Sequence, residues 1–253
     1  MAIDEGHRNF HTKDGRYAPM AKVLEADGCQ VVGHRTAFET ESLKGVNVLV
    51  IANPLPAKGT DEIRSAFSPA EIELLVKWVR EGGALMLIAD HRPYGEATAD
   101  LAKAFGVEMS GGFVVDQDEP GPILFSTAES QLADHEITRG REIGQRVDRV
   151  VTFTGQALRA AGAFEPLLTF DKETVLFADR ASINRNAASK NVAGWHQGMV
   201  SEVGRGRIAV FGEAAMFSAQ LSVNERPMGM NAPAADQNEQ FLLNVLHWLT
   251  RKL

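Results

Sequence analysis

The sequence predicts an α/β protein of flavodoxin-like type: a mostly parallel sheet with helices on both faces, and a C-terminal β-hairpin followed by a helix. Three observations lead to this prediction. Strand and helix signals alternate over roughly the first hundred residues, as in sheets built from β-α units. The runs VNVLVI and GALMLIAD are almost wholly apolar, which is typical of strands covered on both faces. Near the C-terminus, two apolar strands flank a Gly-Arg-Gly turn.

The first predicted elements are short. A strand ends at Asp4, a helix covers residues 17–26 and stops at Gly28, and a second strand covers residues 29–32. Residues 46–51 follow as a buried strand.

The next helix has the clearest signals in the chain. Ser68 is expected to cap it, Pro69 takes its first position, and Glu71 completes an S-x-x-E capping box. Gly82 and Gly83 end it. A buried strand over residues 83–90 and a helix over residues 96–105 come after it.

The second half of the chain has weaker signals until its end. Short strands are predicted over residues 113–115, 123–126, 150–153 and 166–170. A hairpin then turns at residues 204–206 and leads into a short helix after Glu213. The last helix starts at about Asp236, and its inward face is expected to carry Phe241, Leu242, Val245, Leu246 and Leu249.

Length and composition indicate an ordinary globular protein. No linker interrupts the 253 residues, so we predict one domain over residues 1–253. A net charge of -7 disfavours nucleic acid and anionic membranes as partners. No apolar run reaches the roughly 18 residues of a membrane span. Whether the chain forms a homo-oligomer is left open.

The single cysteine, Cys29, excludes an intrachain disulfide and a Cys-pair zinc site. It does not decide the compartment. Met-Ala-Ile leads directly into Asp4, so the first strand lacks its usual approach. We therefore expect a removed export signal and an exported or periplasmic protein, with the cytoplasm as the alternative.

Polar residues stand where the predicted strands end. Ligands of open parallel sheets bind beyond the carboxyl ends of the strands, so these residues are the candidates for a site. They are Asp4, Glu5 and His7, Asn53, Asp90 and His91, Gln156, and Glu213. His11, further into the first loop, and Asn231, in a Met-rich loop, are additional candidates.

The first and fourth predicted strands would end about 10 Å apart if the third lies between them, because neighbouring strands are about 5 Å apart. Side chains of Asp4, His7 and His91 would then reach one divalent metal ion. Asp90 and His91 would equally suit a metal-free acid/base pair. In the structural alternative, the strand-end carboxylates and histidines only cap turns or bond to each other.

Several familiar catalytic patterns are missing from the sequence. It contains no G-x-S-x-G elbow, no G-x-G-x-x-G after the first strand and no G-x-x-x-x-G-K-[ST] loop. The sequence therefore gives no support for Ser hydrolase chemistry or for a nucleotide-binding loop. His34, His135 and His196 are expected at the solvated surface, and His247 as a structural histidine of the last helix.

Five stretches carry a resemblance to a known superfamily: DEGHRNFHTKDGRY, VLVIANP, GGALMLIADHRP, DHEITRGR and GRIAVFGEAAMFSAQ. The chain resembles the class I glutamine amidotransferase-like superfamily. It is most similar to the bacterial branch near the intraflagellar-transport-like (GIFT) and trehalose-utilisation-type domains. The resemblance covers most of the chain and implies a flavodoxin-like fold and a site at the strand ends. Relatives are often exported.

The resemblance does not carry glutaminase activity over to this chain. Amidotransferases of the superfamily place a Cys in a sharp turn after a central strand, and here Asp90 and His91 occupy that turn. We therefore expect a small-molecule enzyme, hydrolytic or isomerising, acting on a polar, carbohydrate-like substrate. Asp90, His91 and Glu213 would be catalytic, and the remaining candidates would bind substrate. The alternatives are a noncatalytic ligand-binding or scaffold domain and an inactive structural domain.

Overall fold

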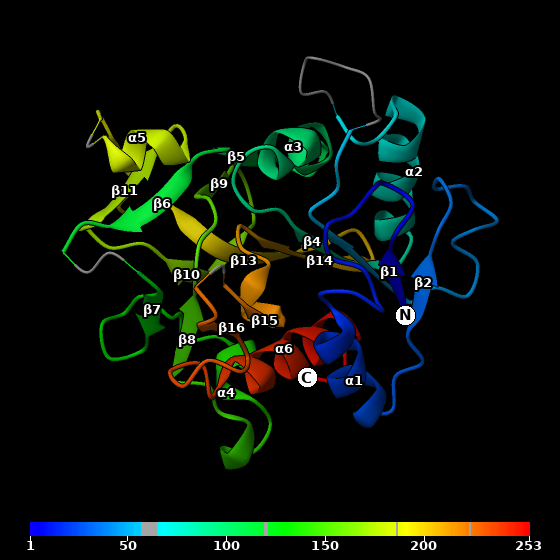
Figure 1. Cartoon of the computed structure of the whole chain (residues 1–253). Helices are drawn as coiled ribbons and strands as arrows, with labels where there is room; N and C mark the ends of the chain where they lie inside the picture. The colour runs from blue at the N-terminus through cyan, green and yellow to red at the C-terminus, as the bar shows by residue number, and fades with distance from the viewer. Residues whose placement is uncertain (57–64, 119–120, 186, 223) are drawn as a thin grey trace.

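A central sheet organises the chain, which a computed structural model describes except for residues 57–64, 119–120, 186 and 223 (Figure 1). Nine strands of the described residues form this sheet: β1 (Ala2–Asp4), β2 (Val32–His34), β3 (Val48–Ala52), β4 (Ala84–Ile88), β5 (Val107–Met109), β9 (Leu158–Ala160), β10 (Glu165–Thr169), β13 (His196–Val203) and β14 (Gly206–Phe211). Their order is β2-β1-β3-β4-β14-β13-β9-β5, with β10 beside β13.

One half of the sheet is parallel and the other half is antiparallel. The strands from β2 to β14 run parallel, and β13 pairs antiparallel with β14 through the predicted hairpin. The flavodoxin-like α/β prediction is confirmed, as is the expectation that β3 lies between β1 and β4. Because the parallel strands point the same way, their carboxyl ends meet at one edge of the sheet.

Helices cover both faces of the sheet, above and below it in Figure 1. Alternate residues of β3 face opposite sides, so Leu49 and Ile51 pack with α2 (Pro69–Arg80) and α3 (Tyr94–Ala104). Val48 and Val50 pack on the other face with α1 (Ala18–Ala26) and α6 (Asn238–Leu249). Each buried Leu, Ile or Val side chain contributes about 1.5–3 kcal/mol to folding.

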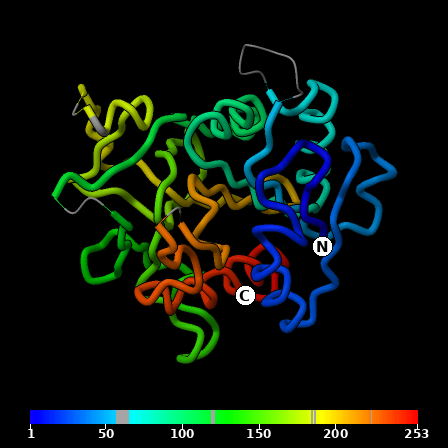
Figure 2. Tube along the Cα trace, in the orientation of Figure 1, coloured from blue at the N-terminus to red at the C-terminus, as the bar shows by residue number. Residues whose placement is uncertain are grey.

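The two best-signalled helices form as the sequence predicts. Ser68 accepts a hydrogen bond from the Glu71 N–H, and the Glu71 carboxylate accepts one from the Ser68 N–H, so the capping box is confirmed. The five residues predicted on the inward face of α6 are all buried. This helix lies beside α1, so the two ends of the chain pack together (Figure 2).

Smaller elements cluster beside the antiparallel half of the sheet (Figure 1). The short strands are β6 (Phe113–Asp116), β7 (Ile123–Ser126), β8 (Arg149–Thr152), β11 (Thr174–Phe177), β12 (Lys190–Asn191), β15 (Ala219–Leu221) and β16 (Pro227–Gly229). The short helices are α4 (Glu136–Arg139) and α5 (Arg180–Asn184), with 3-10 turns η1 (Ile143–Gln145) and η2 (Ala215–Phe217).

Three local predictions need correction. The second strand begins at Val32 rather than at residue 29, because residues 29–31 still form the connection from α1. The helix after β4 begins two residues earlier than predicted, at Tyr94. His135 is buried rather than solvated: it caps α4, with its Nδ1 accepting from the Ile137 N–H. The DHEITRG motif therefore encodes a helix start.

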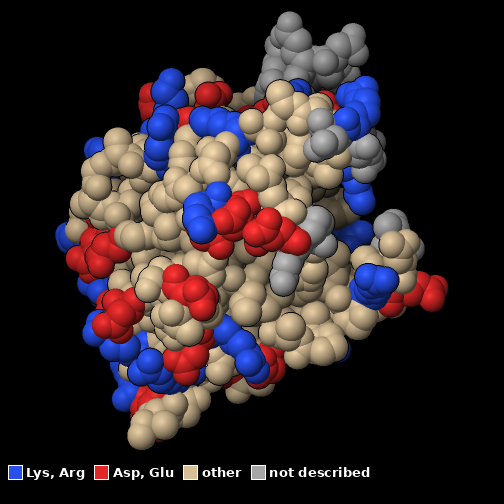
Figure 3. Space-filling view, turned by 90° about the vertical axis from the view of Figure 1, so that its left-hand side faces the viewer, with Lys and Arg blue, Asp and Glu red and all other residues tan. Residues whose placement is uncertain are grey.

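The surface gives no sign of a basic patch on the face in Figure 3, where acidic and basic side chains are interspersed. Among the described residues, none of the helices has the length and apolar character needed to cross a bilayer.

Candidate functional site

The carboxyl edge of the parallel strands gathers four of the predicted site residues. Asp4 ends β1, Asn53 follows β3, and Asp90 and Glu213 come shortly after β4 and β14. Asp4, Asn53 and Glu213 have no exposed surface, and Asp90 is 8% exposed. Buried polar groups at neighbouring strand ends must find partners in one another or in the backbone.

Asn53 holds Asp90 at two points. Its Nδ2 donates to Asp90 Oδ2 at 2.7 Å, and its Oδ1 accepts from the Asp90 N–H at 2.8 Å. The backbone of Asn53 has φ +47, a left-handed conformation that Asn tolerates better than most residues. This turn fixes the amide against the start of the loop after β4.

Asp90 and Glu213 bind successive backbone amides of one turn. Asp90 Oδ1 accepts from the Ala214 N–H at 2.7 Å, and Glu213 accepts from Ala215 at 3.0 Å and Met216 at 2.7 Å. Burial raises the pKa of Asp90 despite its hydrogen bonds. Burial and the charge of Asp90 raise the pKa of Glu213 well above its ordinary value. The pair therefore resists double ionisation.

Gln156 joins this cluster through the backbone that directly follows β4. Its Nε2 donates to the carbonyls of Ala89 at 2.8 Å and Asp90 at 3.0 Å. Its Oε1 accepts from the Gly111 N–H at 2.7 Å. Gly111 lines a cavity of about 410 Å³ that Arg92, Glu96 and other polar residues also line. Gln156 thus connects the buried acid pair to a cavity wall.

Three other predicted residues have partners outside the acid pair. His91 stacks on Phe113 with ring centroids 3.7 Å apart, and its Nδ1 lies 2.8 Å from the Arg92 carbonyl. Glu5 accepts from Arg35 Nε at 2.9 Å and from the backbone of residue 13 at 2.9 Å. Asn231 is exposed and donates to the Gln220 carbonyl at 3.3 Å.

His7 joins the first strand to the start of α2. Its Nδ1 lies 3.0 Å from both carboxylate oxygens of Asp4, and its Nε2 lies 2.9 Å from Glu71 Oε1. The ring packs between Phe38 and Phe67 at centroid distances of 4.6 and 4.7 Å. Both ring nitrogens therefore have a carboxylate partner.

The two carboxylates stabilise the charged form of His7. Burial acts to lower its pKa, but the hydrogen bonds and charges of Asp4 and Glu71 outweigh it and raise the pKa. Burial opposes ionisation of Glu71, yet hydrogen bonds from the Ser68 and Phe38 N–H groups and from His7 lower its pKa to about 2. Sequence reasoning assigned Glu71 only to the capping box.

The predicted metal ligands do not fit a metal ion. Asp4 already accepts from the Gly6 N–H, from His7 and from Asn9 Nδ2, and His7 has no free ring nitrogen. In the parts of the chain that the structure describes, no three His, Cys, Asp or Glu side chains group in a way that could hold a metal.

His11 and His34 are buried, each in a different way. His11 is 1% exposed, and its Nδ1 lies 3.3 Å from Asn53 Nδ2, so the structure brings it to the amide that also binds Asp90. His34 ends β2 and is 8% exposed, so the expectation of a solvated side chain was wrong. Its ring packs on Phe38. Tertiary packing buries both rings, and no local sequence pattern predicts this burial.

An aromatic and polar rim lies next to the acid pair. Phe10 is 45% exposed and packs against Tyr94, with ring centroids 5.7 Å apart. The Arg16 guanidinium lies 4.3 Å from the Phe10 ring and donates to the Gln220 side chain. The charge of Asp90 raises the pKa of Tyr94, although burial is the larger cause. Sequence reasoning missed Phe10, Arg16 and Tyr94.

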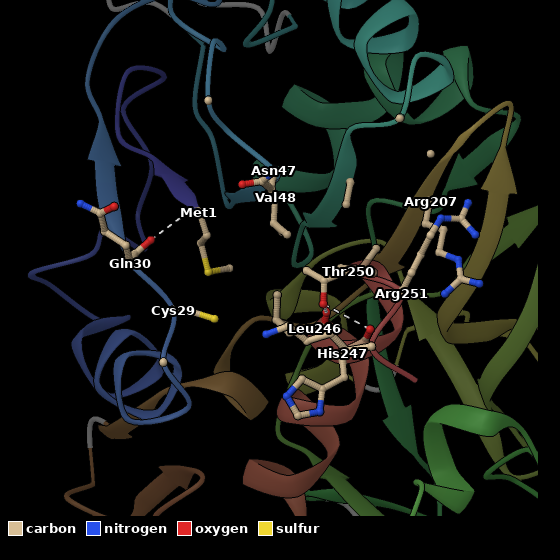
Figure 4. A pocket seen from close by; sticks show the side chains of 17 residues that line it. Met1, Cys29, Gln30, Asn47, Val48, Arg207, Leu246, His247, Thr250 and Arg251 are labelled. Atoms are coloured by element: carbon tan, nitrogen blue, oxygen red, sulfur yellow. Dashed lines mark hydrogen bonds between the residues drawn. The ribbon is translucent and has the colours of Figure 1, made fainter.

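A second cavity, of about 470 Å³, lies at the opposite edge of the sheet, where the strands begin (Figure 4). Two of its lining side chains are already paired: His247 Nε2 lies 2.8 Å from Asp27, and Arg251 donates to Glu202 and the Arg205 carbonyl. Such pairs satisfy helix ends and surface charges. We therefore place the candidate site at the carboxyl edge.

Comparisons with known proteins support the fold. No protein-family model and no curated protein matches the chain. The mmIFT52 N-terminal domain is similar at a TM-score of 0.72 and 17% identity, over 99% of this chain and 97% of that one. This is the fold expected from the resemblance to intraflagellar-transport-like domains.

Two further structures are more distant. The cold-adapted β-galactosidase from Rahnella sp. R3 matches at a TM-score of 0.53 and 10% identity, over 98% of this chain and 31% of that one. A ThuA-like protein from Bacteroides uniformis matches at a TM-score of 0.48 and 13% identity, over 98% and 89% of the two chains. At that score the second likeness supports no inference.

Proposed function

We propose that the chain is a small-molecule enzyme of the class I glutamine amidotransferase-like superfamily that uses a buried carboxyl pair in place of a cysteine. Asp90 and Glu213 are the pair. One observation carries the proposal: both carboxyls are buried and accept hydrogen bonds from successive N–H groups of a single turn, those of Ala214, Ala215 and Met216.

This arrangement supports acid/base chemistry. Two carboxyls that share a low-dielectric site cannot both ionise readily, so one keeps its proton while the other is a carboxylate. The raised pKa values of Asp90 and Glu213 agree with this. The protonated carboxyl would donate to a substrate oxygen, and the carboxylate would accept a proton from the substrate or from a water molecule. The reaction type would be hydrolysis or isomerisation.

The rim supports a polar, carbohydrate-like substrate. Phe10 offers an exposed ring face, and Arg16, Gln220 and Asn231 supply hydrogen-bonding groups around it. Sugars combine apolar ring faces with hydroxyl groups, so they use both kinds of contact.

A substrate panel with two variants tests the proposal. Esters, amides, lactones and glycosides are assayed with the wild type, Asp90→Asn and Glu213→Gln, and folding is checked by circular dichroism. We expect turnover on one substrate class and a loss of about 10²- to 10⁴-fold in each variant. The control Asp134→Asn, an exposed carboxylate, should leave the rate unchanged. Equal rates in all four proteins would contradict the proposal.

A noncatalytic ligand-binding or scaffold domain is the second candidate. It is favoured by the pairing of Asp4, His7 and Glu71 with one another, which leaves these residues no free groups for substrate. This candidate predicts that a compound raises the melting temperature of the wild type while no compound of the panel is converted.

A further inference from the structure

His11 carries a buried ring nitrogen without a partner. The residue is 1% exposed, and its Nε2 makes no hydrogen bond within the described part of the chain. The ring packs against Tyr17 and Phe10, with centroids 4.7 and 5.5 Å away. Its other nitrogen, Nδ1, lies 3.3 Å from Asn53 Nδ2.

The orientation of the Asn53 amide decides which nitrogen of His11 carries the proton. Asn53 Oδ1 accepts from the Asp90 N–H at 2.8 Å, so the amide oxygen and nitrogen cannot be exchanged. Asn53 Nδ2 is then a donor, with one hydrogen directed to Asp90 Oδ2 and the other available to His11 Nδ1. Because Nδ1 accepts, a neutral His11 ring carries its hydrogen on Nε2.

The surroundings keep the ring neutral. Burial and the nearby Arg16 charge lower the pKa of His11 to about 3. An imidazolium would also place a second N–H against the Asn53 amide, where two donors would face each other. His11 is therefore a fixed N–H donor, with no acid/base role at neutral pH.

A buried N–H without an acceptor costs about 1–3 kcal/mol, and folded proteins normally satisfy such groups with a water molecule or a ligand. We propose that His11 Nε2–H donates to an oxygen atom of the molecule bound beside Asp90 and Glu213. This inference rests on the proposed site. It specifies the ligand as one that presents a hydroxyl or carbonyl oxygen to His11.

The tautomer is tested first, on the unmodified protein. Long-range ¹H–¹⁵N correlation spectra should show His11 with a protonated Nε2 and a bare Nδ1, unchanged between about pH 5 and 8. A proton on Nδ1, or titration of the His11 ring near the ordinary His pKa, would overturn the inference, however the variants behave.

The ligand contact is tested with three small probes at high concentration. Acetamide offers a carbonyl oxygen, glycerol offers hydroxyls, and methylammonium offers only donors. We expect acetamide or glycerol to shift the His11 Nε2–H resonance and methylammonium to leave it unmoved. A shift with methylammonium, or no shift with any probe, would overturn the inference.

A matched pair of variants separates this contact from a structural role. His11→Phe keeps the ring stacking and removes the donor, so binding of the responding probe should weaken at least 10-fold. His196→Phe, which removes a half-buried ring bonded to Thr169, should bind as the wild type does. Unchanged affinity in His11→Phe would contradict the inference. If a probe binds through His11 but no substrate of the panel is converted, this inference stands and only the proposed enzymatic activity is rejected.

Discussion

Asn53 and Asp90 form a two-point contact in which the amide of one residue binds both the side chain and the backbone of the other, at 2.7 and 2.8 Å. The contact joins the ends of β3 and β4 beneath the rim of the candidate site. It fixes the position of Asp90, and through Asn53 Nδ2 it also fixes the tautomer of His11. One side chain thus organises two groups of the site.

Replacing Asn53 by Asp tests this contact. The new carboxylate would face Asp90 Oδ2 where an N–H donor now lies, so two buried oxygens would repel each other. We expect the free energy of unfolding to fall by about 3 kcal/mol. Urea denaturation measures it, with Asn47→Asp at an exposed position as the control. Equal losses in the two variants would argue against the contact.

His7→Gln tests the connection between β1 and α2. The substitution leaves buried Asp4 without its cationic partner and removes the ring between Phe38 and Phe67. A loss of about 3 kcal/mol in unfolding free energy is expected. Lys44→Gln breaks an exposed ion pair with Glu41 and should cost less than about 1 kcal/mol. If His7→Gln lowers the unfolding free energy no more than Lys44→Gln does, the connection through His7 does not stabilise the fold.

The contribution of His7 to folding stability should depend on pH. Its pKa is raised in the folded state, so its contribution is complete below the ordinary value of 6.5 and is lost as the pH rises through the folded value. The pKa of Glu71 is about 2, so its contribution is complete above 4.5 and is lost as the pH falls towards 2. The stability gap between wild type and His7→Gln should therefore narrow at alkaline pH. A constant gap from about pH 5 to 9 would refute this.

Asp90 and Glu213 should make the opposite contribution to folding stability, at lower pH than His7 does. A carboxyl whose pKa is raised on folding loses stability as the pH rises above its ordinary value, because the unfolded chain ionises first. As the pH rises above about 4.5, wild-type stability should fall by up to about 1.4 kcal/mol per pH unit for each carboxyl that stays protonated in the folded protein. Glu213→Gln should have a flatter profile. Identical slopes would exclude a raised pKa at Glu213.

The sequence predicts those parts of the fold whose causes are local. The capping box of Ser68 and Glu71 acts within one turn, and the buried strand before Asp90 is a continuous apolar run, so both are recognisable before any tertiary contact is known. The order of β1, β3 and β4 follows from the alternation of strands and helices. That order correctly brings Asp4, Asn53 and Asp90 to one edge.

The partners at the site could not be predicted, because they lie far apart in sequence. Glu71 is recognisable as a cap, yet its second bond reaches His7, 64 residues earlier. The packing of Tyr17 and Phe10 against His11 depends on how the first loop folds back over Asn53. The sequence also does not predict the short strands β5 and β9, because three residues carry no periodicity of their own.

The central claim is that one carboxyl of the Asp90 and Glu213 pair keeps its proton while the other is ionised, and a carboxyl titration tests it most directly. The side-chain ¹³C resonance of Glu213, assigned by comparison with Glu213→Gln, is followed from about pH 3 to 9 in the intact protein. We predict a protonated carboxyl at about pH 7, titrating far above the ordinary range of glutamic acid. Ionisation of both carboxyls at their ordinary values, near pH 4, would contradict the account.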